Sequence, residues 1–258
     1  ASYKPLVGLE VYANFSQNYK PINFTDLWVN NPSFRIDADM QDETGFNADL
    51  GVRGQLFNSL RFDITGFMML YNNRIGYVQA VDPELFSVYR LRTNISNART
   101  FGVETYIRWD AVKALKAKSD WKASVFTNFT FLDARYISSE ESAFMGKRVE
   151  HTPPVLFRSG VDVGWKDLMV SYLISYTDQQ FTDATNAVQT GNAVNGIIPA
   201  YYVMDLTLSY KIWKMKFVGG VENLTDNRYF TRRATGYPGP GIIPSSGRTF
   251  FLTLSFKV

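Results

Sequence analysis

The stretch that decides the fold is GGVENLTDNRYF, residues 219–230, which lies shortly before the chain ends in RTFFLTLSFKV, residues 248–258. A strand-like run stops at Asn223, and a long connection rich in arginine, glycine and proline follows. The final segment alternates, because one of its faces carries only the apolar residues Phe250, Leu252, Leu254, Phe256 and Val258. A period of two indicates a β-strand. The sequence therefore predicts that the last two strands of the chain are joined by a long connection.

The same strand-like character recurs along the whole chain, and no long stretch holds a helical period. In YVMDLTLSYKI, for example, Tyr202, Met204 and Leu206 share one face, whereas Asp205 and Thr207 lie on the other. Ten segments qualify as strands: residues 6–20, 46–57, 60–78, 94–110, 118–137, 155–165, 168–176, 201–212, 215–223 and 248–258. The chain is therefore predicted to be all-β.

The connections between these segments alternate between long and short. The short ones read NS, AVKALKA, KD and WK, and the long ones are rich in Asn, Asp, Pro, Gly and Ser. Outer-membrane barrels have short turns on the periplasmic side and long loops outside. The pattern predicts an antiparallel transmembrane barrel segment of about ten strands with all long loops on one side. The alternatives are that the alternation arose by chance, or that the chain is a soluble β-solenoid.

The two faces of the segments differ in the way that a membrane barrel requires. The apolar face of such a barrel contacts lipid and the polar face lines a wet lumen, whereas a soluble barrel could not bury so many charges inside. Tryptophans near the short turns fit an interfacial aromatic girdle. The polar faces carry Glu10, Asn14, Asp63, Glu104, Arg108, Asp205, Lys211 and Glu222, and the girdle tryptophans are Trp109, Trp121, Trp165 and Trp213.

Composition excludes several classes of protein. The 258 residues include no cysteine and one histidine, and the net charge is +3. Without cysteine there is no disulfide framework and no thiolate metal site or nucleophile. The charge is too small to indicate a nucleic-acid partner. No run of eighteen apolar residues is present, so we expect no transmembrane helix.

The C-terminal motifs resemble those of TonB-dependent outer-membrane transporters. In that family a strand ends in a V-x-N-L-T-D-like motif with an aromatic pair, and a Gly-Arg-aromatic strand closes the barrel. NARTFGVETYIRW, residues 97–109, and VYANFSQNYKPINF, residues 11–24, resemble two further strands of the family. The long last connection looks most like the ferric-dicitrate type. The C-terminal matches are Asn223, Leu224, Asp226, Tyr229, Phe230, Gly247, Arg248 and Phe250.

The resemblance implies a 22-stranded, plugged barrel. Residues 1–258 are then expected to be its C-terminal part, without the plug domain, the N-terminal strands and the segment that contacts TonB. The chain ends on Val258, where the family usually ends on an aromatic residue. Open strand edges in lipid are costly, so we expect the chain to pair with the remaining strands and plug, in the same or a separate chain. A self-closed barrel of ten strands is the alternative.

The implied function is TonB-dependent import of a ferric chelate, such as ferric citrate or a siderophore, across the bacterial outer membrane. No intrinsic cofactor or metal is expected, because iron is carried as a chelate ligand. An anionic chelate needs cations, and the planar fork of arginine suits carboxylates. Lipopolysaccharide phosphates are an alternative partner for such arginines. The Arg232–Arg233 pair is the first candidate, and the full predicted set is Arg232, Arg233, Tyr229, Tyr237, Arg90, Arg92 and Arg148.

Two weaker motifs, one catalytic and one metal-binding, and two alternative functions are also compatible with the sequence. His151 beside Glu150 gives weak support to a protease barrel, and a small self-closed barrel acting as an enzyme or adhesin is one alternative function. The same receptor architecture importing a glycan, a peptide or cobalamin is the other. The acidic cluster DADMQDE supplies hard oxygen ligands of the type that calcium prefers, but lacks the spacing of a known calcium loop. Its carboxylates are Asp37, Asp39, Asp42 and Glu43.

Overall fold

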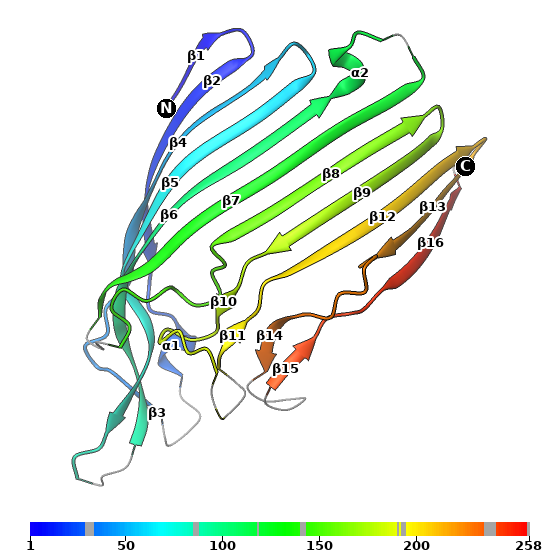
Figure 1. Cartoon of the computed structure of the whole chain (residues 1–258). Helices are drawn as coiled ribbons and strands as arrows, with labels where there is room; N and C mark the ends of the chain where they lie inside the picture. The colour runs from blue at the N-terminus through cyan, green and yellow to red at the C-terminus, as the bar shows by residue number, and fades with distance from the viewer. Residues whose placement is uncertain are drawn as a thin grey trace.

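The structure is a computed structural model that describes residues 1–28, 34–84, 88–117, 119–139, 143–189, 191, 195–234 and 241–256. One broad antiparallel sheet dominates it (Figure 1). Neighbours along this sheet are β1 (Ser2–Leu6), β2 (Leu9–Lys20), β4 (Glu43–Leu56), β5 (Leu60–Val81), β6 (Val88–Asp110), β7 (Trp121–Ser139), β8 (Val155–Trp165), β9 (Leu168–Thr177), β12 (Tyr201–Ile212), β13 (Met215–Glu222) and β16 (Thr249–Phe256).

All ten predicted segments form strands of this sheet, so the predicted all-β antiparallel fold is confirmed. The first segment was predicted as one strand from residue 6, and this boundary is wrong. The chain turns at Val7 and Gly8, where Gly8 has a φ of 84°, and β1 pairs back on β2. The turn brings the backbone of Gly8 against Gln55, since a Cβ on Gly8 would lie 2.7 Å from the Gln55 carbonyl oxygen. Only glycine fits such a position without strain.

Short turns lie at one end of the sheet and long connections at the other, as the alternation predicted (Figure 1). In the two-residue turns after β8 and β12, Lys166 and Trp213 take a left-handed φ of 51° and 52°. The predicted turn AVKALKA contains a one-turn helix, α2 (Ala111–Ala114), whose first turn is capped by the Asp110 side chain. Its N-cap bond, from the Lys113 backbone N–H to Asp110, explains why this connection stays compact.

The long connections contain small elements that alternation did not predict. The connection after β2 contains α1 (Phe24–Leu27) and β3 (Phe34–Ile36), and β3 pairs in parallel with β6. The one after β9 contains the hairpin β10 (Gln180–Phe181) and β11 (Ile197–Ile198). The last one contains the hairpin β14 (Phe230–Ala234) and β15 (Gly241–Pro244). Strands β5 and β6 also extend three and six residues further than predicted, because bulges absorb the break in their alternation.

The sheet has one apolar and one polar face along its whole width. Direct cross-strand partners point to the same face, and the polar face carries the ion pairs Glu10–Arg53 at 3.1 Å and Arg108–Asp162 at 3.7 Å. Large apolar side chains on the other face stay exposed, for example Phe15 at 70% and Leu50 at 64%. The four predicted girdle tryptophans lie at the short-turn end and are also exposed.

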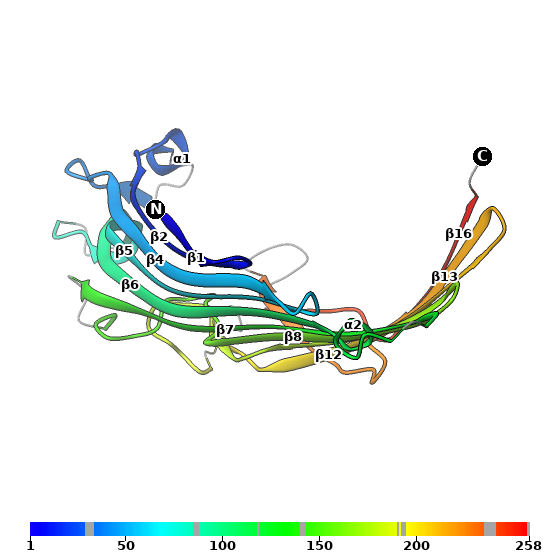
Figure 2. The same ribbon diagram turned by 90° about the horizontal axis from the view of Figure 1, so that it is seen from above.

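The sheet is curved into an open trough, and its first and last strands lie at opposite rims (Figure 2). In the part of the chain that the structure describes, β1 and β16 each pair with one neighbour only. Self-closure of this chain into a small barrel is therefore not observed. Within that same part, no helix is both long and apolar enough to span a membrane.

Candidate ligand site among the long connections

The GGVENLTDNRYF motif, residues 219–230, attaches the last long connection to the sheet. Asn223 has a left-handed φ of 51° and is almost fully buried. Its backbone N–H donates to Asp205, and its side chain both donates to and accepts from the backbone of Asn227 at 2.9 Å. Asp226 accepts from the Arg248 backbone N–H at 2.9 Å, which lowers the pKa of the Asp226 carboxyl. The connection therefore starts and ends at one clasp beside β16.

A polar cavity of about 630 Å³ lies at the end of the sheet that bears the long connections. Strands β5 and β6 supply one side of its lining, and two long connections supply the rest through residues 143, 144, 150, 182–185 and 195. Cavities of 300–1,000 Å³ are typical of small-molecule sites. Its polar lining residues are Arg74, Tyr77, Arg92, Glu150, Thr182, Asp183, Thr185 and Asn195.

A bulge in β5 aims Arg74 at this cavity. The register with β6 shifts on both sides of Arg74, and Asn73 before it has a φ of 56°. Asn94 and Asn97 of β6 hold the bulge by bonds to the Asn73 backbone O and N–H, at 2.6 Å and 2.9 Å. A bulge of this kind redirects a side chain. The redirected Arg74 can therefore reach across to a different long connection.

Arg74 meets a half-buried acid and a buried tyrosine there. One of its guanidinium nitrogens lies 2.9 Å from Glu150 and another donates to the Tyr136 hydroxyl at 3.2 Å. The Tyr136 hydroxyl in turn donates to Glu150, and Tyr136 is only 1% exposed. This triad closes the floor of the cavity with a satisfied charge network, which fixes the geometry of the arginine.

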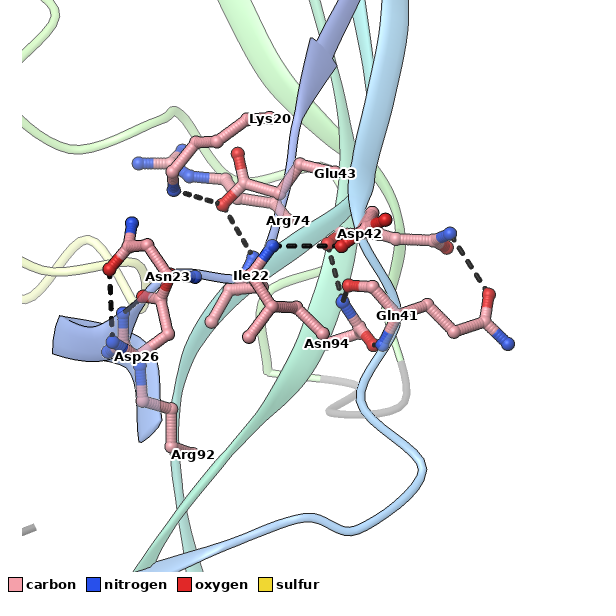
Figure 3. Close-up of polar contacts among 12 residues, drawn as sticks. Lys20, Ile22, Asn23, Asp26, Gln41, Asp42, Glu43, Arg74, Arg92 and Asn94 are labelled. Atoms are coloured by element: carbon pink, nitrogen blue, oxygen red, sulfur yellow. Dashed lines mark hydrogen bonds and ion pairs between the residues drawn. The ribbon is translucent and has the colours of Figure 1, made fainter. Parts of the chain in front are cut away.

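Arg92 is held by the first long connection. Its guanidinium forms an ion pair with Asp26 of α1 and lies 4.7 Å from the centre of the Tyr77 ring. Figure 3 shows Asp26 next to Asn23, whose backbone N–H it accepts. Burial opposes ionisation of Asp26, but the bonds from Arg92 and Asn23 outweigh it and hold the pKa of this carboxyl below its ordinary value. The pair therefore ties α1 to β6 beside the cavity.

The charges of the cavity lining are balanced, because it holds two arginines, Arg74 and Arg92, and two acids, Glu150 and Asp183. Both arginines are already paired with a carboxylate, Arg74 within the lining and Arg92 with Asp26 beside it. Hydroxyl and amide groups of Thr182, Thr185 and Asn195 complete it. The arrangement offers both donors and acceptors, so it suits a polar ligand of mixed character better than a simple anion.

The predicted pair Arg232 and Arg233 lies on β14, where the two side chains differ. Arg233 donates to the Ile197 carbonyl oxygen at 3.0 Å and packs over the Phe230 ring, so it braces two long connections against each other. Arg232 is exposed. Tyr229 stacks on Tyr201, with ring centres 4.6 Å apart. The predicted Tyr237 lies outside the described residues.

The other predicted arginines do not join that pair. Arg90 pairs through its backbone with Phe34 of β3, and its side chain lies outside what the structure describes. Arg92 lines the cavity. Arg148 is opposite Arg135 in an isolated bridge, and its backbone exchanges two bonds with the Asn186 side chain. The predicted set is therefore distributed over three places at the same end of the sheet.

Three acids of the acidic cluster, and Glu150 beside His151, are engaged by neighbouring groups. Asp37 accepts from the Thr93 hydroxyl, and Glu43 accepts from the Ile75 backbone. Figure 3 shows Asp42 accepting from the Ile22 backbone and Glu43 from Lys20. Among the described residues, no three His, Asp or Glu side chains gather closely enough to hold a metal ion. His151 is exposed at a φ of 55°, and the carboxylate beside it, Glu150, is bound by Arg74 and Tyr136.

Sequence reasoning missed Arg74, Tyr136 and Glu150, which form the best-defined polar group of the site. A signal was present for Arg74, because NNRIG, residues 72–76, interrupts the alternation of β5 with two asparagines and a glycine. Tyr136 and Glu150 carry no comparable local signal. Their role depends on a long connection folding back over β7, where Tyr136 donates to Lys147 from its backbone N–H at 3.0 Å.

Several solved structures share the fold over nearly the whole chain. The unliganded ferric citrate transporter FecA has a TM-score of 0.80 and 20% identity, and the match covers 99% of this chain and 37% of that one. The ferric yersiniabactin uptake receptor FyuA from Yersinia pestis gives 0.74 and 21%, covering 98% and 35%. The copper transporter OprC gives 0.71 and 16%, covering 99% and 38%. At these identities the likeness shows the fold alone.

This chain spans little more than a third of the length of those proteins. No curated protein sequence matches it significantly. The family model for the TonB dependent receptor-like β-barrel matches residues 1–224, which is most of the chain. Together with the open, two-faced sheet and its one-sided long connections, this match shows that the chain belongs to the TonB-dependent receptor β-barrel family.

Proposed function

We propose that the receptor containing this chain imports a ferric chelate, with energy supplied through TonB. Receptors of this family lie in the bacterial outer membrane and are transporters, not enzymes. Titles of similar structures name ferric citrate and ferric yersiniabactin as cargo of those proteins, and copper for another. The remaining barrel strands, the plug and the contact with TonB are part of this proposal, because the chain covers only a part of the receptor.

The observation that carries the proposal is the polar cavity among the long connections. In an outer-membrane barrel these connections face the outside, so the cavity lies where a chelate arrives. Its volume of about 630 Å³ suits a small organic ligand, and arginines Arg74 and Arg92 are fixed in its lining. The finer proposal is an anionic chelate such as ferric citrate, for which the exposed Arg232 on β14 supplies a positive charge at the same end of the sheet.

The balanced charge of the cavity lining supports a second candidate. A neutral polar cargo, such as a glycan or a peptide, uses donors and acceptors equally, and the cavity offers both from Arg74, Glu150, Asp183 and Asn195. The two candidates differ in one respect. An anionic chelate needs a net positive charge at the site, whereas a neutral cargo does not.

The test measures binding and uptake of labelled ferric citrate by cells that express the complete receptor. We expect uptake to require TonB, and Arg232→Ala to weaken binding about tenfold, which corresponds to one charge-assisted hydrogen bond of roughly 1.5–3 kcal/mol. Arg61→Ala is the matched control, because Arg61 lies at the short-turn end and contacts Gln55. Surface expression is matched between variants.

Two outcomes distinguish the candidate functions and sites. Equal binding by the wild type and by Arg232→Ala moves the site to the cavity of Arg74 and Arg92. Failure of the receptor to bind any ferric chelate removes the iron proposal and favours the neutral cargo. Arg233→Ala is expected to increase proteolysis of the last long connection as well, because it removes the brace to Ile197.

A further inference from the structure

Three arginines from neighbouring segments form one row on the apolar face of the sheet. In the β6–β7 ladder Arg99 is directly opposite Arg135, and Arg135 is directly opposite Arg148. Direct cross-strand partners point to the same face. The ladder continues without a shift from Arg99 to Phe101 and Val103, which are exposed on the apolar face. The three guanidinium groups therefore lie on the outer wall of the barrel and not in its lumen.

The row lies at the level where the apolar wall ends. On β7, Trp121 belongs to the girdle at the short-turn end, and Phe131 is the last apolar residue before Asp133 and Arg135 on the same face. Ten residue steps of ~3.3 Å, at a strand tilt of about 40°, rise about 25 Å, which is the height of the apolar band of an outer-membrane barrel. The arginine row is therefore at the level of the lipid headgroups in the outer leaflet.

The row is built into the structure and is not a set of free surface charges. Arg99 lies 4.4 Å from the centre of the Phe101 ring, with its Nε buried and without a hydrogen-bond partner. Arg135 is held by Asp133 at 2.8 Å and by the Gly146 carbonyl oxygen at 3.1 Å. The Asn186 side chain fixes the backbone of Arg148 through bonds of 2.7 Å and 2.8 Å. Three positive charges thus face one carboxylate.

An apolar groove of about 670 Å³ opens on the same face directly below the row. Small residues make its floor and larger ones its wall, and a Cβ added to Gly66 would meet no atom within 4 Å. Phe101 is two residues from Arg99 along β6, which places the groove about 7 Å from the row at the strand rise of ~3.4 Å per residue. Floor and wall comprise Ala13, Ala48, Gly66, Phe101, Val103 and Phe131.

We propose that this part of the wall binds a phosphorylated lipid of the outer leaflet, with its phosphate on Arg99, Arg135 and Arg148 and an acyl chain in the groove. Arginine binds phosphate oxygens with two parallel hydrogen bonds, and burial of an acyl chain in the groove adds apolar contact. The row and the groove together match an amphiphile, whereas a soluble anion would use the row alone. The site is separate from the proposed cargo site, because it is on the opposite face of the sheet.

The test uses the complete receptor, purified in mild detergent, with lipid A as the probe and native mass spectrometry as the readout. We expect the wild type to retain the lipid, and Arg99→Gln combined with Arg135→Gln to reduce retention at least tenfold. Gly66→Leu places a side chain in the groove at a position where a Cβ meets no atom within 4 Å, and is expected to reduce retention with the arginines intact. Arg61→Gln removes the same charge at the short-turn end and is the matched control. Heat-modifiable migration on gels verifies that each variant is folded.

Competition distinguishes the sources of the phosphate. Inorganic phosphate at millimolar concentration is expected to leave the bound lipid in place, and dephosphorylated lipid A is expected to bind at least tenfold more weakly. Equal retention by the folded double variant and the wild type would overturn the proposal. Displacement of the lipid by inorganic phosphate alone would instead indicate a site for soluble anions. If the double variant does not fold, Arg148→Gln and Gly66→Leu test the two halves separately.

Discussion

At the scale of single residues, the hydrogen bonds of Asn223 explain the structural role of the family motif. Its left-handed backbone and its side-chain bonds to Asn227 start the last long connection, and Asp226 joins the far end of the same connection through the Arg248 N–H. A Cβ on Gly247 would lie 2.8 Å from the Asp226 carboxylate. Asn223, Asp226 and Gly247 of the motif therefore form a clasp that joins the two ends of the last long connection.

Asn223→Ala is expected to destabilise the receptor. The substitution removes two side-chain hydrogen bonds and forces alanine into a left-handed φ, at a total cost of roughly 2–4 kcal/mol. Urea unfolding of the complete receptor in detergent micelles measures this change. Asn14→Ala is the control, because Asn14 is exposed on β2. Equal midpoints for the two variants would show that the clasp is dispensable.

Acid is expected to release α1 from the barrel. Because the pKa of Asp26 is below its ordinary value in the folded state, the ion pair with Arg92 stabilises α1 fully above the ordinary carboxyl pKa of ~3.9. That stabilisation is lost as pH falls through the lowered value. Arg92, Lys20 and Tyr77 are the charged and titratable groups around this contact.

The release of α1 is measured by limited proteolysis of residues 21–42 with an acid-active protease between pH 5 and pH 2. Cleavage is expected to rise only in the acidic part of the range for the wild type. Asp26→Asn is expected to be cleaved at every pH, since its neutral amide leaves the buried Arg92 without its counter-ion. A wild-type cleavage rate that is constant with pH would contradict the assignment.

At the scale of elements, glycines on the polar face are covered by aromatic rings from the neighbouring strand. Each of four pairs is directly opposite in the ladder, so the ring folds over the missing side chain: Tyr12 with Gly51, Phe67 with Gly102, Phe126 with Gly160, and Phe251 with Gly220. Cross-strand aromatic coverage of glycine pins strand register. The repetition in four ladders indicates that register is fixed pair by pair along this barrel wall.

Gly160→Ala is therefore expected to destabilise the receptor, whereas Gly66→Ala is not. A Cβ at residue 160 would lie 2.4 Å from the Phe126 ring, and overpacking of this kind costs about 1–3 kcal/mol. At residue 66 the same Cβ meets no atom within 4 Å, so alanine is expected to be neutral or stabilising by up to ~1 kcal/mol. Guanidinium unfolding of both variants gives the comparison. Equal loss in both would mean that the rings do not set the register.

The strands were predictable from sequence because their alternation extends over eight residues or more. Elements of two to five residues, such as β1, β10 and β14, are too short to show a period, and their pairing depends on distant segments. The contacts of Arg74 were not predictable for the same reason, because those with Tyr136 and Glu150 join residues 62 and 76 positions apart. Arg92 and the Arg232–Arg233 pair lie at the long-connection end of the sheet, and their contact with cargo stays a prediction.

At the scale of the whole molecule, the sheet has two unpaired rims. Strands β1 and β16 are exposed along their length and lie at opposite sides of the trough (Figure 2). Backbone groups left unpaired in lipid cost several kcal/mol each. Because the chain belongs to this family, we propose that the remaining strands of a 22-stranded barrel close the sheet. One of these strands would then pair with β1 and another with β16.

Residues 1–258 alone are therefore expected to aggregate in detergent, without the heat-modifiable gel migration of a closed barrel. Addition of the missing strands, either in the same chain or as a separately produced segment, is expected to restore that migration, because both rims then pair and no backbone row faces lipid. Size-exclusion chromatography and gels of boiled and unboiled samples measure the two states. As a control for misfolding during refolding, the complete receptor is refolded under identical conditions. A monodisperse, heat-modifiable monomer from residues 1–258 alone would show that β1 and β16 can meet, and that the open trough is a state that closes on itself.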